Sequence, residues 1–184
     1  TALTFDGDAY ASQADAGYAT GGSSFTAEAW INTSATGSYM TFLEMGTALA
    51  TNTAVLGLDS SGHLMGAFSG MGGPTTTATV NDGQWHHVAM VYDSTVGTFG
   101  TVTLYIDGEA QPETVTALGS APNIDAGELT IGNAVGHDEG FTGMVDEVRV
   151  FGDARTDEEL FENHVVPLDP TAEGADLLAY FPLD

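Results

Sequence analysis

The chain has 184 residues, which is enough for one domain with a full hydrophobic core. It carries 26 Asp and Glu residues against two Arg and no Lys, a formal charge of −24, so repulsion excludes nucleic acids and anionic lipids as partners. Most of these acids are expected to serve solubility. Because such self-repulsion weakens a compact state unless salt or divalent cations screen it, the composition indicates a saline (halophilic or marine) or calcium-bearing environment.

Cysteine is absent, which excludes disulfides, thiolate nucleophiles and zinc–thiolate sites. No segment approaches the roughly 18 consecutive apolar residues of a membrane helix, so we expect no membrane insertion. The chain starts at TALTFDG without a charged and then apolar leader, so a secretion signal would have to lie outside this segment.

Short β-type runs dominate the sequence, and turn signals such as SSG, NDG and DG separate them. The runs are ALTF (2–5), FTAEAWINT (25–33), YMTFLEM (39–45), TAVLGLD (53–59), HLMGAFS (63–69), TTATV (76–80), WHHVAMVYD (85–93), TVTLYID (101–107), ELTIG (128–132), MVDEVRVF (144–151) and LLAYFPL (177–183). Many alternate apolar with polar residues, so one face packs inward. The pattern predicts an all-β protein, an antiparallel β-sandwich or jelly roll.

One short helix is predicted near the C-terminus, at TDEELFEN (156–163). Thr156 and Glu159 have the spacing of a capping box, and the acids of the first turn suit the positive end of the helix dipole. Residues 165–184 are expected to form a linker and a last strand. We therefore predict a single domain over residues 1–184, although the last strand could instead belong to a following module.

The stretch GMVDEVRVF (143–151) raises a specific question. Strict alternation places Met144, Asp146, Val148 and Val150 on one side of the strand, so Asp146 would stand in an apolar row. A carboxylate there must be protonated, hydrogen-bonded or matched by a cation, because burying its charge costs several kcal/mol.

Several segments resemble, in order, the laminin-G-like, concanavalin-A-like jelly-roll domains of bacterial extracellular proteins. They are ALTFDGDAYA, FTAEAWINT, NDGQWHHVAMVYD, TVTLYIDGEA, ELTIGN and TGMVDEVRVFGDARTDEEL, and they cover most of residues 1–163. The resemblance implies two antiparallel sheets and, in many relatives, a calcium ion near the edge of the sandwich. It does not imply one function, because the fold hosts lectins, spacers, receptor modules and hydrolases.

The resemblance points to Asp6 and Asp146 as calcium ligands, with Asp8 as a weaker third. Calcium takes about six to eight hard oxygen ligands, including carboxylates and backbone carbonyls, and no other metal-binding chemistry is abundant in this sequence. The alternative for Asp146 is a carboxylate that accepts hydrogen bonds from loop amides.

Two further regions are candidates for binding a ligand. The loop NAVGHDEGF (133–141) concentrates Asn133, His137, Asp138 and Glu139, whose amide, imidazole and carboxylate groups suit a polyhydroxyl ligand. The alternative is an ordinary solvated acidic loop. The Gly-rich segments SGMGGPT (69–75) and DSTVGTFG (93–100) lack a phosphate-binding signature, and we expect Asp93 to border the ligand surface.

The remaining candidates are predicted to be structural. His86 and His87 point to opposite faces of one strand and are expected to pack or hydrogen-bond, and Trp30 and Trp85 are expected in the core. Catalysis is not expected, because the chain lacks the Glu-x-Asp-x-x-Glu pattern of related laminarinase-like enzymes, the Gly-x-Ser-x-Gly elbow and the His-Glu-x-x-His helix.

The sequence thus favours a calcium-dependent, lectin-like adhesion module of a large extracellular or cell-surface bacterial protein. Its expected partners are glycans or polysaccharides on a cell or biofilm surface, together with other domains of the same chain. The alternative is a non-catalytic structural or protein-binding spacer that calcium stabilises.

Overall fold

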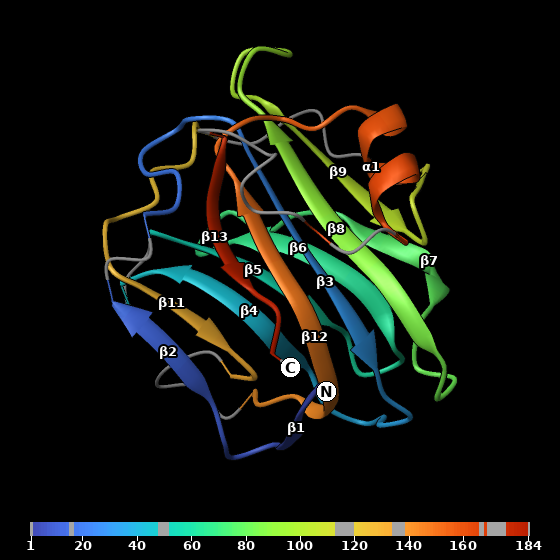
Figure 1. Ribbon diagram of the computed structural model, residues 1–184. Coiled ribbons are helices and arrows are strands. Elements are labelled where there is room, and N and C mark those ends of the chain that lie inside the picture. The colour runs from blue at the N-terminus through green and yellow to red at the C-terminus, as the bar shows by residue number, and fades with distance from the viewer. Residues whose placement is uncertain are drawn as a thin grey trace.

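A computed structural model describes residues 2–14, 17–47, 52–112, 120–133, 139–165, 168 and 176–183. Within these ranges the chain forms two antiparallel β-sheets packed face to face and one short helix (Figure 1). The predicted all-β antiparallel sandwich with a helix near its C-terminus is therefore confirmed.

Sheet A has seven strands, and sheet B has six. The order in sheet A is β1 (Leu3–Asp6), β12 (Thr142–Phe151), β3 (Phe25–Asn32), β8 (Trp85–Asp93), β9 (Thr101–Ile106) and β10 (Glu109–Ala110), with β13 (Leu177–Phe181) also paired to β12. The order in sheet B is β2 (Ala11–Ala14), β11 (Glu128–Ile131), β4 (Met40–Gly46), β5 (Thr53–Leu58), β6 (His63–Phe68) and β7 (Thr75–Thr79). Figure 1 shows sheet A in front of sheet B.

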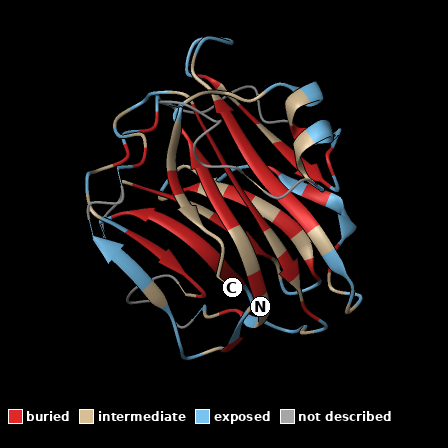
Figure 2. Ribbon diagram, in the orientation of Figure 1, coloured by how far each residue is buried: buried red, intermediate tan, exposed pale blue. Residues whose placement is uncertain are grey.

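The core lies between the two sheets. Alternate residues of β3 point into it, namely Phe25, Ala27, Ala29 and Ile31, as their spacing predicts. Figure 2 shows the central strands largely buried and the edge strand β2 exposed. Phe25 packs edge-on against Phe68 of the other sheet, with ring centroids 6.1 Å apart, so aromatic contacts join the layers.

Two strands went unrecognised in the sequence, β2 and β10. Both are short edge strands, and their residues are almost entirely exposed, so neither carries the alternation of apolar and polar side chains that reveals a half-buried strand. The last predicted strand does form, as β13, and it pairs with residues 148–151 of β12.

The helix α1 (Asp157–Asn163) covers part of the outer face of sheet A (Figure 1). Its predicted capping box is confirmed, because the Thr156 side chain accepts the Glu159 N–H while the Glu159 side chain accepts the Thr156 N–H. Leu160 anchors the helix in a small apolar cluster on β8 and β9. No helix in the described ranges is long and apolar enough to cross a membrane.

A β-bulge in β12 corrects the predicted side-chain alternation. The register with β3 shifts between Asp146 and Arg149, and Glu147 adopts a positive φ of 49°. Val145, Val148 and Val150 consequently all face the core. The predicted row that joined Asp146 to Val148 and Val150 was wrong, and Asp146 instead pairs with Trp30 on the outer face of sheet A.

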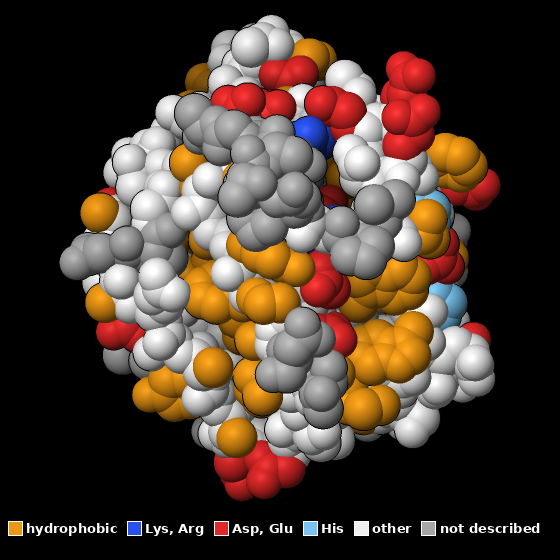
Figure 3. All heavy atoms as spheres, in the orientation of Figure 1, with side chains coloured by type: hydrophobic (Ala, Val, Ile, Leu, Met, Phe, Trp, Pro, Cys, Tyr) orange, Lys and Arg blue, Asp and Glu red, His pale blue; other side chains and the backbone are white. Residues whose placement is uncertain are grey.

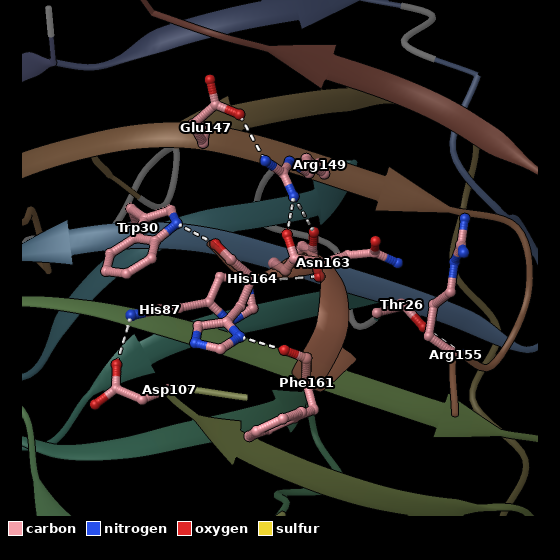
Figure 4. Close-up of polar contacts among 11 residues, drawn as sticks. Thr26, Trp30, His87, Asp107, Glu147, Arg149, Arg155, Phe161, Asn163 and His164 are labelled. Atoms are coloured by element: carbon pink, nitrogen blue, oxygen red, sulfur yellow. Dashed lines mark hydrogen bonds and ion pairs between the residues drawn. The ribbon is translucent and has the colours of Figure 1, made fainter. Parts of the chain in front are cut away.

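A buried charge network fastens α1 to this outer face, which we call the covered face. The Arg149 guanidinium lies 3.1 Å from a carboxylate oxygen of Glu28 and 2.7 Å from one of Glu147, and it donates to the Asn163 carbonyl at the end of α1 (Figure 4). Arg149 is 2% exposed. Burial raises the pKa of Glu28, but His87 and Arg149 more than offset this, so its pKa lies below the ordinary value. Both groups are therefore charged in the folded protein.

We predict that Arg149→Met lowers the free energy of unfolding by about 3–5 kcal/mol, because the substitution leaves the Glu28 carboxylate buried without its cation. Urea unfolding followed by circular dichroism measures this loss. The double variant Arg149→Met with Glu28→Leu should be more stable than Arg149→Met alone, since no uncompensated charge remains. A double variant that is less stable than the single variant would contradict this account.

Candidate functional site

The structure separates the two principal calcium candidates. Asp6 on β1 pairs with Thr142 on β12. Thr142 precedes Asp146 by four residues on the same strand. At the rise of a β-strand, this spacing is about 13 Å, too long for one calcium coordination sphere. Asp6 and Asp146 are therefore not brought together.

Each of these carboxylates has a local role. Asp6 Oδ1 accepts the N–H groups of Asp8 and Ala9, which hold its pKa below the ordinary value. Asp146 Oδ1 accepts the Glu147 N–H at 3.0 Å and so supports the bulge. This contact corresponds to the alternative in which Asp146 accepts a hydrogen bond from the backbone.

Asp6 and Asp8 do adjoin the predicted binding loop. A Cβ atom on Gly140 would overlap the Gly7 carbonyl oxygen, so the turn after β1 lies directly against the end of the loop 133–141. Among the described residues, no group of three or more His, Asp and Glu side chains is arranged to hold a metal. A calcium ion at this rim would thus need backbone carbonyls in addition to the two carboxylates.

The loop 133–141 is described only at its two ends. The Thr41 N–H donates to the Glu139 carbonyl at 2.6 Å, and the Thr130 hydroxyl donates to the Asn133 carbonyl at 3.0 Å. These bonds place Asn133 and Glu139 beside β4 and β11 of sheet B. Asn133 Oδ1 is buried and has no hydrogen-bond partner among the described atoms. His137 and Asp138 lie outside the described residues.

Asp93 is not part of this region. Asp93 ends β8 next to Phe25, the first residue of β3. The loop 133–141 leads into β12 at the opposite end of β3, near Asn32. The Asp93 carboxylate accepts the N–H and the hydroxyl of Thr95 at 2.9 and 2.7 Å, so it stabilises its own turn.

The outer face of sheet B differs from the covered face. No described helix or strand packs extensively on it: apart from their sheet neighbours, the strands of sheet B make substantial contact only through β6, with the inner side of β9. Its outward residues from β11 to β6 are Thr130, Glu44, Val55, Gly57, Met65 and Ala67. We call this surface the open face. Most of its side chains are short, so a ligand could approach the strands closely.

Polar groups lie at the side of the open face next to the loop. Glu44 pairs in register with Thr130 and is 5% exposed, and Asn133 follows at the end of β11. Sequence reasoning missed Glu44, although a signal was available: it stands between the core residues Leu43 and Met45, so alternation turns it outward. Carboxylate, amide and hydroxyl groups beside short apolar side chains suit a polyhydroxyl ligand.

The histidine prediction holds for His86 and His87, whereas that for the tryptophans does not. The His86 ring bridges Asp107 and Asp82 at 2.9 and 3.2 Å, and His87 is buried beside Glu28. Trp30 and Trp85 lie outside the core, on the covered face. Trp30 stands between the core residues Ala29 and Ile31 and therefore points outward. Trp85 pairs with Asn32 and so lies on the same face as Trp30. Trp30 Nε1 donates to the His164 carbonyl, which anchors the chain after α1 (Figure 4).

The chain belongs to the concanavalin A-like lectin/glucanases superfamily, since a model of that family, Laminin_G_3, matches residues 5–161. The resemblance drawn from the sequence is thereby confirmed.

Solved structures agree with this assignment. A structure from Bacteroides ovatus, described as a candidate carbohydrate-binding protein, is 26% identical with a TM-score of 0.73, and the match covers 100% of this chain and 51% of that one. Domain 4 of an arabinanase from Geobacillus stearothermophilus, in complex with arabinotriose, is 20% identical, with a TM-score of 0.65 and coverage of 88% and 75%. The CBM40 of an IT-sialidase from Ruminococcus gnavus, bound to α2,3-sialyllactose, is 16% identical, with a TM-score of 0.59 and coverage of 76% and 82%. The last two show the fold alone.

We predict that His86 makes stability pH-dependent. Partial burial lowers the pKa of His86, but Asp107 and Asp82 more than offset it, so the pKa lies above its ordinary value of 6.5. The stabilisation is therefore complete below about pH 6.5 and is lost as the pH rises through the folded-state pKa. His86→Gln should lower the melting temperature more at about pH 5.5 than at about pH 9. An equal loss at both pH values would contradict a charged His86.

Proposed function

We propose that this chain is a non-catalytic carbohydrate-binding module and that a glycan binds on the open face next to the loop 133–141. The observation that carries the proposal is the difference between the two outer faces. α1 and the Arg149 network occupy part of the covered face, whereas the open face combines short side chains with Glu44, Thr130 and Asn133. The likeness to the Bacteroides ovatus structure supports the same ligand class.

The chemistry of the open face suits sugars. Sugar hydroxyl groups donate hydrogen bonds to carboxylate and amide oxygens, and the half-buried Asn133 and the Glu44 carboxylate lie at this side of the face. The aliphatic surfaces of Val55, Met65 and Ala67 offer contacts to the apolar faces of a sugar ring. Together they provide both halves of a sugar site, polar acceptors and an apolar floor.

A binding role fits the carboxylates better than catalysis does. Glycoside hydrolysis needs two carboxylates that flank the sugar bond. Glu28 and Glu147 do lie near each other, but both are ion-paired to the same guanidinium on the covered face. Those two acids therefore serve the scaffold.

The wider setting is part of the proposal. The chain spans about half the length of the Bacteroides ovatus structure, so a module of a larger protein is consistent with that match. We propose an extracellular or cell-surface protein that adheres to glycans of a cell or biofilm surface, and the charge of −24 supports an environment in which salt screens repulsion.

A structural or protein-binding spacer is the second candidate function. The observation in its favour is the set of exposed apolar side chains on the covered face and the end of α1, Trp85, Phe161 and Val165, which are 38%, 58% and 66% exposed. Figure 3 shows apolar side chains gathered on this side of the molecule. Stability without any glycan affinity would favour this second function.

We predict that Ala67→Trp weakens glycan binding at least about tenfold, because the indole would cover the floor of the open face. The matched control is Ala110→Trp on the exposed edge strand β10 of sheet A, which should bind like the parent protein. A glycan array identifies a ligand, and titration calorimetry then compares the three proteins. Parallel losses in both variants, or an array without any bound glycan, would contradict the proposed site or function respectively.

We also propose that calcium binds at the rim formed by Asp6 and Asp8. With a dissociation constant near 10⁻³ M, as in many extracellular modules, about 10 mM calcium would stabilise the fold by about 1.4 kcal/mol. The melting temperature should rise in calcium relative to chelator, and Asp6→Asn should abolish this rise.

Asp146→Ala is the matched control for the calcium test. This variant should lower the melting temperature equally in calcium and in chelator. It removes the hydrogen bond in the bulge but leaves the proposed calcium ligands Asp6 and Asp8 in place. If Asp146→Ala removed the calcium response and Asp6→Asn retained it, the rim would be the wrong location. A parent protein without a calcium response would end the calcium proposal.

A further inference from the structure

The two fixed positive charges of the chain are both used inside the protein. Arg149 is held by Glu28 and Glu147. Arg155 is 10% exposed, lies 3.2 Å from Glu159, and stacks over the Phe151 ring at 3.9 Å from its centroid. Both belong to the covered face, and there is no lysine. Neither guanidinium is therefore available to a ligand on the open face.

The described histidines also face acids or carbonyls. His63 Nδ1 lies 2.8 Å from Asp59, and the His86 ring contacts Asp82 and Asp107. His87 is buried beside Glu28, and His164 Nδ1 lies 2.7 Å from the Phe161 carbonyl. Of these, His63 lies on the sheet of the open face, directly beside the Asp59 carboxylate.

Acids surround the proposed glycan site. Glu44 lies in the open face itself, Glu128 stands two residues from Thr130 on β11, and Glu139 lies near the end of the loop 133–141. Figure 3 shows that the opposite side of the molecule is similar, with acidic side chains in several places and arginine atoms confined to a small area. Among the described side chains no arginine faces this surface, so in the absence of a bound metal ion an anionic ligand would meet repulsion here, and a negative potential would also slow its approach.

We infer that the ligand of the open face is a neutral glycan and that saccharides carrying carboxylate or sulfate groups are rejected. This inference rests on the proposed function and specifies its ligand class. Neutral hydroxyl groups donate to the carboxylate and amide oxygens of the site, whereas a carboxylate or sulfate on the sugar would be a further acceptor facing acceptors of like charge. Discrimination comes from the rejected ligand's repulsion as much as from contacts to the accepted one.

The shared fold does not set this preference. The Ruminococcus gnavus domain is bound to α2,3-sialyllactose, a saccharide with a carboxylate, although it has the same overall fold at 16% identity. In the present chain both arginines belong to the covered face. The ligand class therefore follows from where the charges lie.

The test compares matched pairs of neutral and acidic glycans in chelator, by titration calorimetry or on arrays. Suitable pairs are lactose with sialyllactose, mannan with polymannuronate, and galactan with polygalacturonate. At about 0.05 M salt the acidic member should bind at least about tenfold more weakly, and the difference should shrink at about 1 M salt, where the screening length falls to about 3 Å. The affinity for the neutral member should change less than about twofold.

Ala67→Lys tests the cause of the preference. A cation on the open face should narrow the gap between the acidic and neutral members, whereas Ala110→Lys, which adds the same charge on the far edge of sheet A, should leave it nearly unchanged. Equal effects of the two variants would overturn the local charge argument. Equal or tighter binding of the acidic member by the parent protein would overturn the inference, and absence of binding to both members would overturn the proposed function.

Discussion

The Arg149 guanidinium holds together three parts of the chain that are distant in sequence. It bonds Glu28 of β3, Glu147 in the bulge of β12, and the carbonyl of Asn163 where α1 ends. Removing such charges from water is costly, and the cost is offset only when the geometry supplies several partners. These three partners meet that condition, and Trp30 adds a further bond from its indole to the His164 carbonyl. The position of α1 on sheet A, and hence the closure of one face of the sandwich, depends on this network.

Closing one face has a consequence for the other. The polar residues of the two outer faces differ: Glu28, Arg149 and His87 stabilise the covered face, whereas Glu44 and Asn133 lie beside the open face. Function on this fold is set by such local chemistry, since the superfamily alone does not determine it. Among the described residues, the same division leaves the open face with acids and hydrogen-bond acceptors, while both arginines lie on the covered face.

The sequence was sufficient for the architecture and for α1, because apolar alternation and the Thr156 and Glu159 capping box are local signals. It was insufficient for the edge strands β2 and β10, which bury too little to alternate. It also misplaced Asp146, since a one-residue bulge with positive φ at Glu147 exchanges the faces of the residues that follow, and no glycine marks that position. The candidate site was predicted in part: Asn133 and Glu139 lie together, but which acids share a rim depends on strand register, which separates Asp6 from Asp146.

The bulge in β12 lies between the two places where mechanical load would enter the sandwich. β1 and β13 lie in line along the same edge of β12, and the first residue of β1, Leu3, pairs with Val145, while the last residue of β13, Phe181, pairs with Val148. Both ends of the described chain therefore leave sheet A at adjoining points, as Figure 1 shows for the N and C labels. Tension between these ends would act first on the few hydrogen bonds on either side of Asp146 and Glu147. A molecule held in this way would be pulled at the middle of one sheet edge, away from the outer surface of sheet B.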